Sequence, residues 1–150
     1  MTFRSSAEIE SYIRSKLPAV VKNVQQQVFE IFMEHLVRYY AEYEPTMYER
    51  TYQLLSNCLD YSGPEMSGGK VTCKVFYDPS RLDYSYHYIN GVSYPHHGWT
   101  GEDVVESAAH GMHGGKIPGT AIYDTPLAGV SVEYISMFRA AFAAAGIPVK

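Results

Sequence analysis

An apolar stripe between residues 20 and 39 is the sequence feature that most constrains the fold. Apolar side chains recur there every three or four residues, at Val20, Val24, Val28, Phe32, Leu36 and Tyr39. This spacing places them on one face of an α-helix, and the face is widened by Phe29, Ile31 and Tyr40. Because a helix with such a face must bury it against another element, the sequence predicts a long helix that forms one wall of a core.

Two further helices are expected beside this long one. Ser5 and Glu8 have the spacing of a capping box, and the apolar residues that follow predict a helix over about residues 6–17. Pro18 is expected to end or kink it. Glu44-Pro45 breaks the long helix, and Thr46 and Glu49 then form a second capping box. A helix from residue 46 to about residue 59 should follow, with one face made by Tyr48, Tyr52, Leu55, Cys58 and Leu59.

The middle of the chain has the alternation and turn residues of β-structure. Ser62-Gly63-Pro64 and Ser67-Gly68-Gly69 predict a flexible loop, and residues 71–77 alternate as a strand that Asp78-Pro79-Ser80 closes. Residues 84–89 alternate too, and Asn90-Gly91 is a strong hairpin signal before residues 92–94. The simplest arrangement of these strands is an antiparallel meander.

Helical signals return near the C-terminus. Thr100 and Asp103 predict a cap for a short helix through Ala109 that Gly111 stops, and Ile122-Tyr123 is expected to form a last short strand. A final helix over about residues 130–145 should end at Gly146. Its expected buried face consists of Tyr134, Ile135, Phe138, Ala141 and Phe142.

These elements predict an α+β class, with N-terminal helices and a C-terminal helix packed on a small antiparallel sheet. A length of 150 residues, 46% of them hydrophobic, fits a single domain over residues 1–150. A Tyr/Gly/His-rich loop region is expected at about residues 81–124. Few aliphatic side chains lie there to order it by burial.

Charge and cysteine content exclude several classes of protein. A formal net charge of −4 argues against a protein whose main task is gripping nucleic-acid phosphates. Cys58 and Cys73 are the two cysteines, and we expect both to be reduced core thiols. No apolar run approaches the ~20 residues that cross a bilayer, so no membrane partner is expected.

A group of histidines is the sharpest catalytic candidate. It comprises His87, His96, His97, His110 and His113, and the spacing of His110 and His113 suits two imidazoles on one metal ion. A third ligand could come from His96, His97, Glu102 or Asp103. The frame around His113 is glycine-rich and no zinc signature is present, so our prediction is no metal, no cofactor and no catalysis. A small His-dependent metal hydrolase remains the alternative.

Tyrosine is the compositional outlier, with 14 copies gathered largely in two blocks. Tyrosine gives large, stiff, amphipathic contact area, and its enrichment is typical of protein interfaces. The predicted partner-contact residues are Tyr43, Tyr48, Arg50, Tyr84, Tyr86, Tyr88, Tyr94 and Trp99.

Two short segments resemble a known family. Arg50-Thr51-x-x-Leu54 after a proline-marked turn is similar to the Arg-Thr-Gly-x-Leu segment of phage tail-completion proteins of the HK97 gp10-like type, with Tyr52 in place of the glycine. The second segment is Ala109-x-Gly111-x-His113-Gly114-Gly115, followed by Ile122-Tyr123-Asp124-x-Pro126 and a helix.

The resemblance implies a non-catalytic structural protein of a bacteriophage virion, assembled in the cytoplasm of a bacterial host. It would join or complete the tail at the head–tail interface as a ring of subunits, such as a hexamer. Its partners would be further copies of itself and neighbouring connector or tail-tube proteins. A phage-encoded inhibitor of a host protein is a further alternative that the same features permit.

Overall fold

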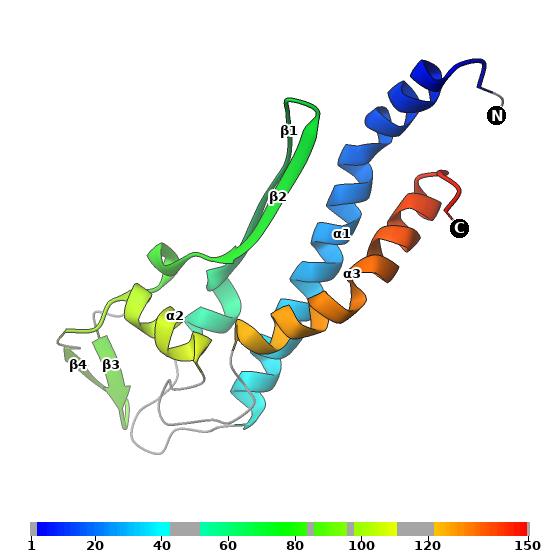
Figure 1. Ribbon diagram of the computed structural model, residues 1–150. Helices are drawn as coiled ribbons and strands as arrows, with labels where there is room; N and C mark the ends of the chain where they lie inside the picture. The colour runs from blue at the N-terminus through cyan, green and yellow to red at the C-terminus, as the bar shows by residue number, and fades with distance from the viewer. Residues whose placement is uncertain (1–2, 43–51, 84–85, 96–97, 111–121, 150) are drawn as a thin grey trace.

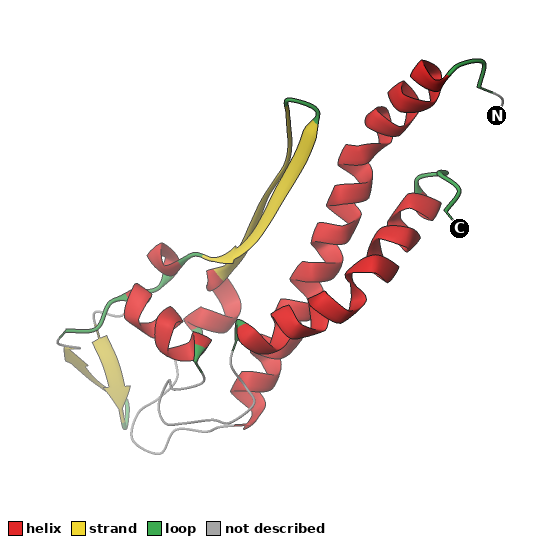
Figure 2. Ribbon diagram, viewed as in Figure 1, coloured by secondary structure: helices red, strands yellow, loops and turns green. Residues whose placement is uncertain are grey.

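The computed structural model describes residues 3–42, 52–83, 86–95, 98–110 and 122–149. Two long helices lie side by side, α1 (Ser6–Glu42) and α3 (Asp124–Ala144), and both chain termini lie at the same end of this pair (Figure 1). A hairpin of β1 (Leu59–Ser67) and β2 (Lys70–Tyr77) packs along α1. A second hairpin, of β3 (Tyr86–Ile89) and β4 (Val92–Pro95), lies at the opposite end, beside the short helix α2 (Gly101–Ala109). Figure 2 shows the α+β class that the sequence predicted, so this prediction is confirmed.

Helix α1 runs for 37 residues and continues through Pro18, so the prediction of two helices separated at this proline is wrong. A proline inside a helix removes one backbone donor, while the flanking helical bonds remain and burial of the apolar stripe adds to them. Only one of the two hydrogen bonds of the predicted N-terminal capping box is present. The Ser5 hydroxyl accepts from the Glu8 N–H at 3.3 Å, but the Glu8 carboxylate accepts at 2.7 Å from Arg4, one residue before the cap.

The predicted stripe of α1 is the centre of the core. Five of its six positions are buried, at Val20, Val24, Phe32, Leu36 and Tyr39. Val20 and Val24 pack against Met137 and Ala141 of α3. Phe32, Leu36 and Tyr39 belong to a larger cluster with residues of the first hairpin and α2, among them Leu59, Tyr77, Val104 and Ala108. The long helix therefore joins two clusters, as a single wall shared by both.

Residues 59–67 form β1, so the prediction of a flexible loop over residues 62–69 is wrong except at its tip. The tip is Gly68-Gly69, a two-residue turn whose positive φ values of 57° and 78° suit glycine. Gly63 lies in a bulge at φ 96°, where a Cβ atom would stand 2.8 Å from the Thr72 carbonyl oxygen. Only Leu59 in this strand is buried, so β1 lacks the alternating apolar pattern that identifies a strand.

The helix expected from residue 46 is seen in its last part only, because Thr46 and Tyr48 lie outside the described residues. A single π-helical turn, Leu54–Cys58, precedes β1, and Leu54, Cys58 and Leu59 are buried. Tyr52 is not helical. It has a positive φ of 56°, the left-handed conformation that glycine adopts most easily.

The expected meander is instead two separate two-stranded antiparallel sheets among the described residues. The strand at residues 71–77 and the Asn90-Gly91 hairpin are confirmed, with φ of 51° at Asn90 and 74° at Gly91. Within the Tyr/Gly/His-rich region at about residues 81–124, residues 86–95 form the β3–β4 hairpin and residues 101–109 form α2.

Helix α2 has the cap that its sequence predicted. The Thr100 hydroxyl accepts from the Asp103 N–H at 3.3 Å, and the Asp103 carboxylate accepts from the Thr100 N–H at 2.6 Å. Ile122 and Tyr123 form a turn, not the predicted strand, and the buried Ile122 donates its N–H to the Ala108 carbonyl at 3.2 Å. The stop expected at Gly111 lies outside the described residues.

Helix α3 begins at Asp124, six residues before the predicted start, because Pro126 fits in a first helical turn. Its end is as predicted. Gly146 has a φ of 78°, and the Gly146 and Ile147 N–H groups donate to the carbonyls of Ala143 and Phe142 in the Schellman pattern.

Candidate functional site

The predicted contact residues that the structure describes lie on the surface at one end of the molecule. Tyr86, Tyr94 and Trp99 all have exposed side chains. Tyr88 lies in β3, although its side chain is not described. The other four predicted contacts, Tyr43, Tyr48, Arg50 and Tyr84, fall outside the described residues.

The β3–β4 hairpin is apolar on both of its faces. Its register pairs Tyr86 with Pro95 and Ile89 with Val92, which places Tyr86 on one face and Ile89, Val92 and Tyr94 on the other. All four of these side chains are exposed. A two-stranded hairpin is only marginally stable alone, and a cluster of exposed apolar side chains often marks an interaction site. The hairpin is therefore a candidate docking element.

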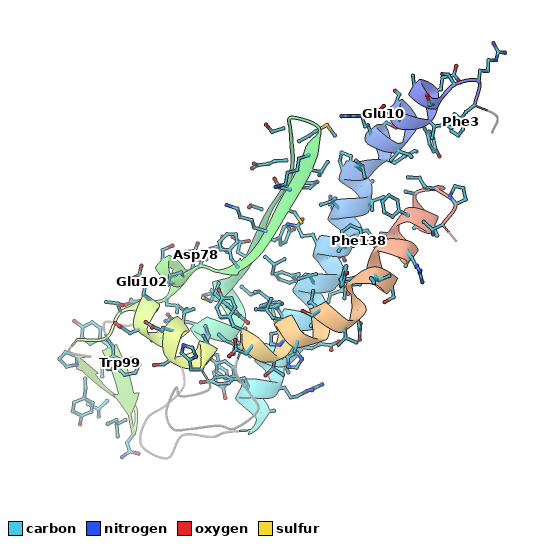
Figure 3. All side chains as sticks on the ribbon, viewed as in Figure 1. Phe3, Glu10, Asp78, Trp99, Glu102 and Phe138 are labelled. Atoms are coloured by element: carbon cyan, nitrogen blue, oxygen red, sulfur yellow. The ribbon has the colours of Figure 1, made fainter. Side chains whose placement is uncertain are left out.

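The short helix α2 follows this hairpin in the chain and is anchored in the core. Val104, Val105 and Ala108 are buried in the core, and Trp99 stands directly before the helix (Figure 3). Gly101 packs so closely on the neighbouring 3-10 turn that a Cβ atom there would lie 2.3 Å from the Pro79 carbonyl oxygen. Beside Trp99 is a shallow pocket of about 360 Å³, lined also by Gly98, Asp103, Glu106, Ser107 and His110.

The outer face of α3 is a second apolar surface. The prediction that Tyr134, Ile135 and Phe138 are buried is wrong, because all three are exposed, and so are Leu127 and Val132. Val132 is 84% exposed. The helix is apolar almost all round. Met137 and Ala141 are buried against α1, and Phe142 and Ala145 are partly buried beside them. The hydrophobic periodicity of the sequence predicts the helix, but it does not indicate which of the apolar faces is buried.

The same helix meets the length and composition of a membrane span. It holds three charged residues, Asp124, Glu133 and Arg139, and only 11% of its most apolar 18-residue window is buried. The core helix of a soluble protein can have the same length and composition, but most of its residues are buried. The low burial therefore identifies α3 as a helix whose outer face lacks a cover within the described part of the chain.

The predicted histidine group lies only partly within the residues that the structure describes. No group of three or more His, Cys, Asp or Glu side chains is close enough there to hold a metal ion. His96, His97 and His113 fall outside the described residues, and so does the side chain of His87. His110 lies at the C-terminal end of α2, where its side chain is exposed.

Both cysteines are free thiols, but only Cys58 lies in the core as predicted, because Cys73 is half-buried. The buried Cys58 Sγ donates to the Asp78 carbonyl oxygen at 3.3 Å. Burial is the main cause that raises the pKa of Cys58 to about 11. Because the thiolate is the reactive form, Cys58 is a packing residue and no nucleophile at neutral pH.

One buried polar residue that the fold uses was not predicted from the sequence. Gln25 is 3% exposed, and its Nε2 donates to the carbonyls of Ser62 and Lys74, one on each strand of the first hairpin. The sequence contains a signal for this role. Gln25 lies four residues after Val21 and four before Phe29, so it shares one face of the helix with these apolar residues. A polar residue on such a line needs a hydrogen-bond partner from another element.

Comparison with known proteins gives a family for this chain. A family model described as YomN matches residues 5–133, from the cap of α1 to the middle of α3. No curated protein and no solved structure matches the chain. The match covers well over half of the sequence and includes both hairpins and α2.

Proposed function

Because the chain belongs to the YomN family, whose name derives from a Bacillus phage, we propose that it is a non-catalytic structural protein of the phage particle. The family name suggests a phage-associated protein. The finer role follows the resemblance of the Arg50-Thr51 segment to tail-completion proteins. In this role the protein joins or completes the tail at the head–tail interface as a ring of subunits.

The observation that carries this proposal is the presence of two different apolar surfaces on one small chain. One is the β3–β4 hairpin and the other is the outer face of α3 with Leu127, Tyr134 and Phe138. They lie on different parts of the molecule, as Trp99 beside the hairpin and Phe138 on α3 illustrate (Figure 3). A closed ring needs such an arrangement, since each subunit must offer two distinct surfaces that fit one another.

In the proposed ring, the hairpin of one subunit packs on α3 of the next. The contact would cover the aromatic and aliphatic side chains of both surfaces at once. Large apolar residues of this kind dominate the energy of protein interfaces. Neither surface needs a metal or a cofactor to act in this way.

Paired variants test the ring directly. The hairpin variant is Val92→Glu and the α3 variant is Val132→Glu, and both positions are exposed, so we expect both chains to fold. Native mass spectrometry should find a closed oligomer for the wild type and monomers for each variant alone. An equal mixture of the two variants should give a dimer, because one intact hairpin then meets one intact α3.

The matched control is Lys70→Glu, an exposed position at the turn of the other hairpin, which should leave the oligomer unchanged. A wild type that stays monomeric at high concentration would contradict the ring, and so would a mixture that gives no dimer. Mass spectrometry of purified phage particles then tests the location of the protein. Its absence from the particle would favour the inhibitor of a host protein, and stoichiometric metal in purified protein would favour the hydrolase.

A further inference from the structure

A pocket between α1 and the first hairpin lies apart from both proposed docking surfaces. Its volume is about 360 Å³, and its walls come from two turns of α1 and from β1. Figure 1 shows this hairpin along the N-terminal half of α1, at the opposite end from β3–β4. The lining residues are Lys22, Gln25, Gln26, Phe29, Glu30 and Tyr61.

Within the residues that the structure describes, no group donates a hydrogen bond to the side-chain oxygen of Gln25. Its Nε2 donates both hydrogens, one to the Ser62 carbonyl at 2.8 Å and one to the Lys74 carbonyl at 2.9 Å. Because both partners are acceptors, the amide orientation is fixed and the Oε1 atom points away from these two carbonyls. Oε1 has no hydrogen-bond partner within the described part of the chain, although the residue is only 3% exposed. A buried acceptor of this kind is costly until a donor reaches it.

The other polar groups of the pocket are mainly acceptors as well. Gln26 donates its Nε2 to the Glu30 carboxylate at 3.2 Å, which leaves the Gln26 amide oxygen available. The Glu30 carboxylate keeps further acceptor positions, because one hydrogen bond uses only part of its capacity. Lys22 is the one cation among the six lining residues.

Aromatic rings form the remaining wall. Phe29 and Tyr61 pack edge to face, with ring centroids 5.6 Å apart. The faces of such rings attract cations, and a guanidinium group both stacks on them and donates up to five hydrogen bonds. A pocket with two amide oxygens, a carboxylate and two aromatic rings matches this chemistry better than it matches an anion.

We propose that the pocket between α1 and β1 binds a guanidinium or alkylammonium cation. Gln25 and Gln26 accept from its N–H groups, Glu30 supplies the opposite charge, and Phe29 and Tyr61 contact its carbon and nitrogen faces. The source is either an arginine or lysine side chain of a protein partner or a free small amine. This site does not depend on the ring, so it stands or falls separately from the proposed function.

Titration of the full-length protein by ¹H–¹⁵N NMR tests the site. The probes are N-acetyl-arginine amide and its neutral counterpart N-acetyl-citrulline amide, which has the same shape without the charge. We expect saturable shifts at the side-chain amides of Gln25 and Gln26 and at the backbone near Tyr61. The arginine compound should bind about five-fold more tightly, as a cation–aromatic contact at a partly exposed site implies. Equal affinity of the two probes, or no saturable shift, would overturn the proposal.

Two variants separate the contribution of charge from that of shape. Glu30→Gln removes the carboxylate and should weaken arginine binding several-fold, whereas Lys22→Gln removes a like charge and should strengthen it. Both side chains are exposed, so the spectra should otherwise match those of the wild type. Unchanged affinity in Glu30→Gln, or tighter binding of acetate than of the arginine compound, would contradict a cation site.

A peptide arm distinguishes the two sources of the cation. Gly-Gly-Arg-Gly-Gly adds backbone on both sides of the same side chain. Binding about ten-fold tighter than the capped amino acid would identify a protein partner, because flanking contacts then add to the affinity. Equal binding by the peptide and by the capped amino acid would identify a small cation as the guest.

Discussion

Tyr52 holds a backbone conformation that its side chain disfavours. Its φ of 56° lies in the left-handed region, which costs a residue with a Cβ about 1 kcal/mol or more. Its ring stacks on Tyr40 with centroids 5.4 Å apart, a contact that offsets part of this cost.

Substitutions at Tyr52 should separate the ring from the backbone. Tyr52→Ala loses the stacking and keeps the strain, whereas Tyr52→Gly loses the stacking and relieves the strain. We therefore expect the glycine variant to be more stable than the alanine variant by about 1 kcal/mol in urea unfolding. Tyr52→Phe keeps both ring and conformation and should match the wild type. An alanine variant at least as stable as the glycine variant would show that the positive φ carries no strain.

The helix α2 depends on a cap that titrates. Hydrogen bonds from the Thr100 side chain and backbone lower the pKa of Asp103 below its ordinary value. A lowered pKa in the folded state stabilises the fold above the unfolded pKa of about 3.9 and loses this effect as pH falls through the folded value. The charged form also lies in the first turn, where the helix dipole favours it.

The stability difference between wild type and Asp103→Ala should therefore be constant from neutral pH down to about pH 5 and should shrink below about pH 4. Chemical unfolding at a series of pH values measures this difference. Glu106→Ala is the control, because this residue lies in the same helix but outside the cap. A difference that persists unchanged at pH 3 would indicate that Asp103 acts through packing and not through its charge.

Elements with local signals were predictable from the sequence, and elements that depend on distant partners were not. The α1 stripe, the Asn90-Gly91 turn and the Thr100–Asp103 cap each depend on residues within a few positions of one another. Strand β1 was missed because its stability comes from pairing with β2 and from Gln25, which is 37 residues away from Ser62. On α3 the predicted Ala141 is buried, but Tyr134, Ile135 and Phe138 are not, because distant elements such as α1 decide which side of the helix is covered.

At the scale of the whole molecule, the two hairpins have different relations to the core. The first hairpin packs along α1, and Gln25 ties both of its strands to the helix. The second makes its main contacts between its own two strands and has no comparable contact with another described element. Folding should therefore depend on the first hairpin, and assembly should depend on the second.

Replacing residues 86–95 by a short Gly-Ser linker should leave a folded monomer. The expected loss of unfolding free energy is below about 1 kcal/mol, since the residues removed bury little apolar surface and each residue freed of order gains conformational entropy. The same linker in place of residues 62–72 should destabilise the chain strongly. It removes most of the pairing between β1 and β2, and it disturbs the hairpin whose carbonyls accept hydrogen bonds from Gln25 of α1. Circular dichroism during thermal unfolding compares the two chains.

If the chain without β3–β4 fails to fold, the second hairpin is needed for folding, and the proposal that its exposed tyrosines bind a partner is contradicted. A folded chain that still forms the closed oligomer would show that the ring contact does not include this hairpin.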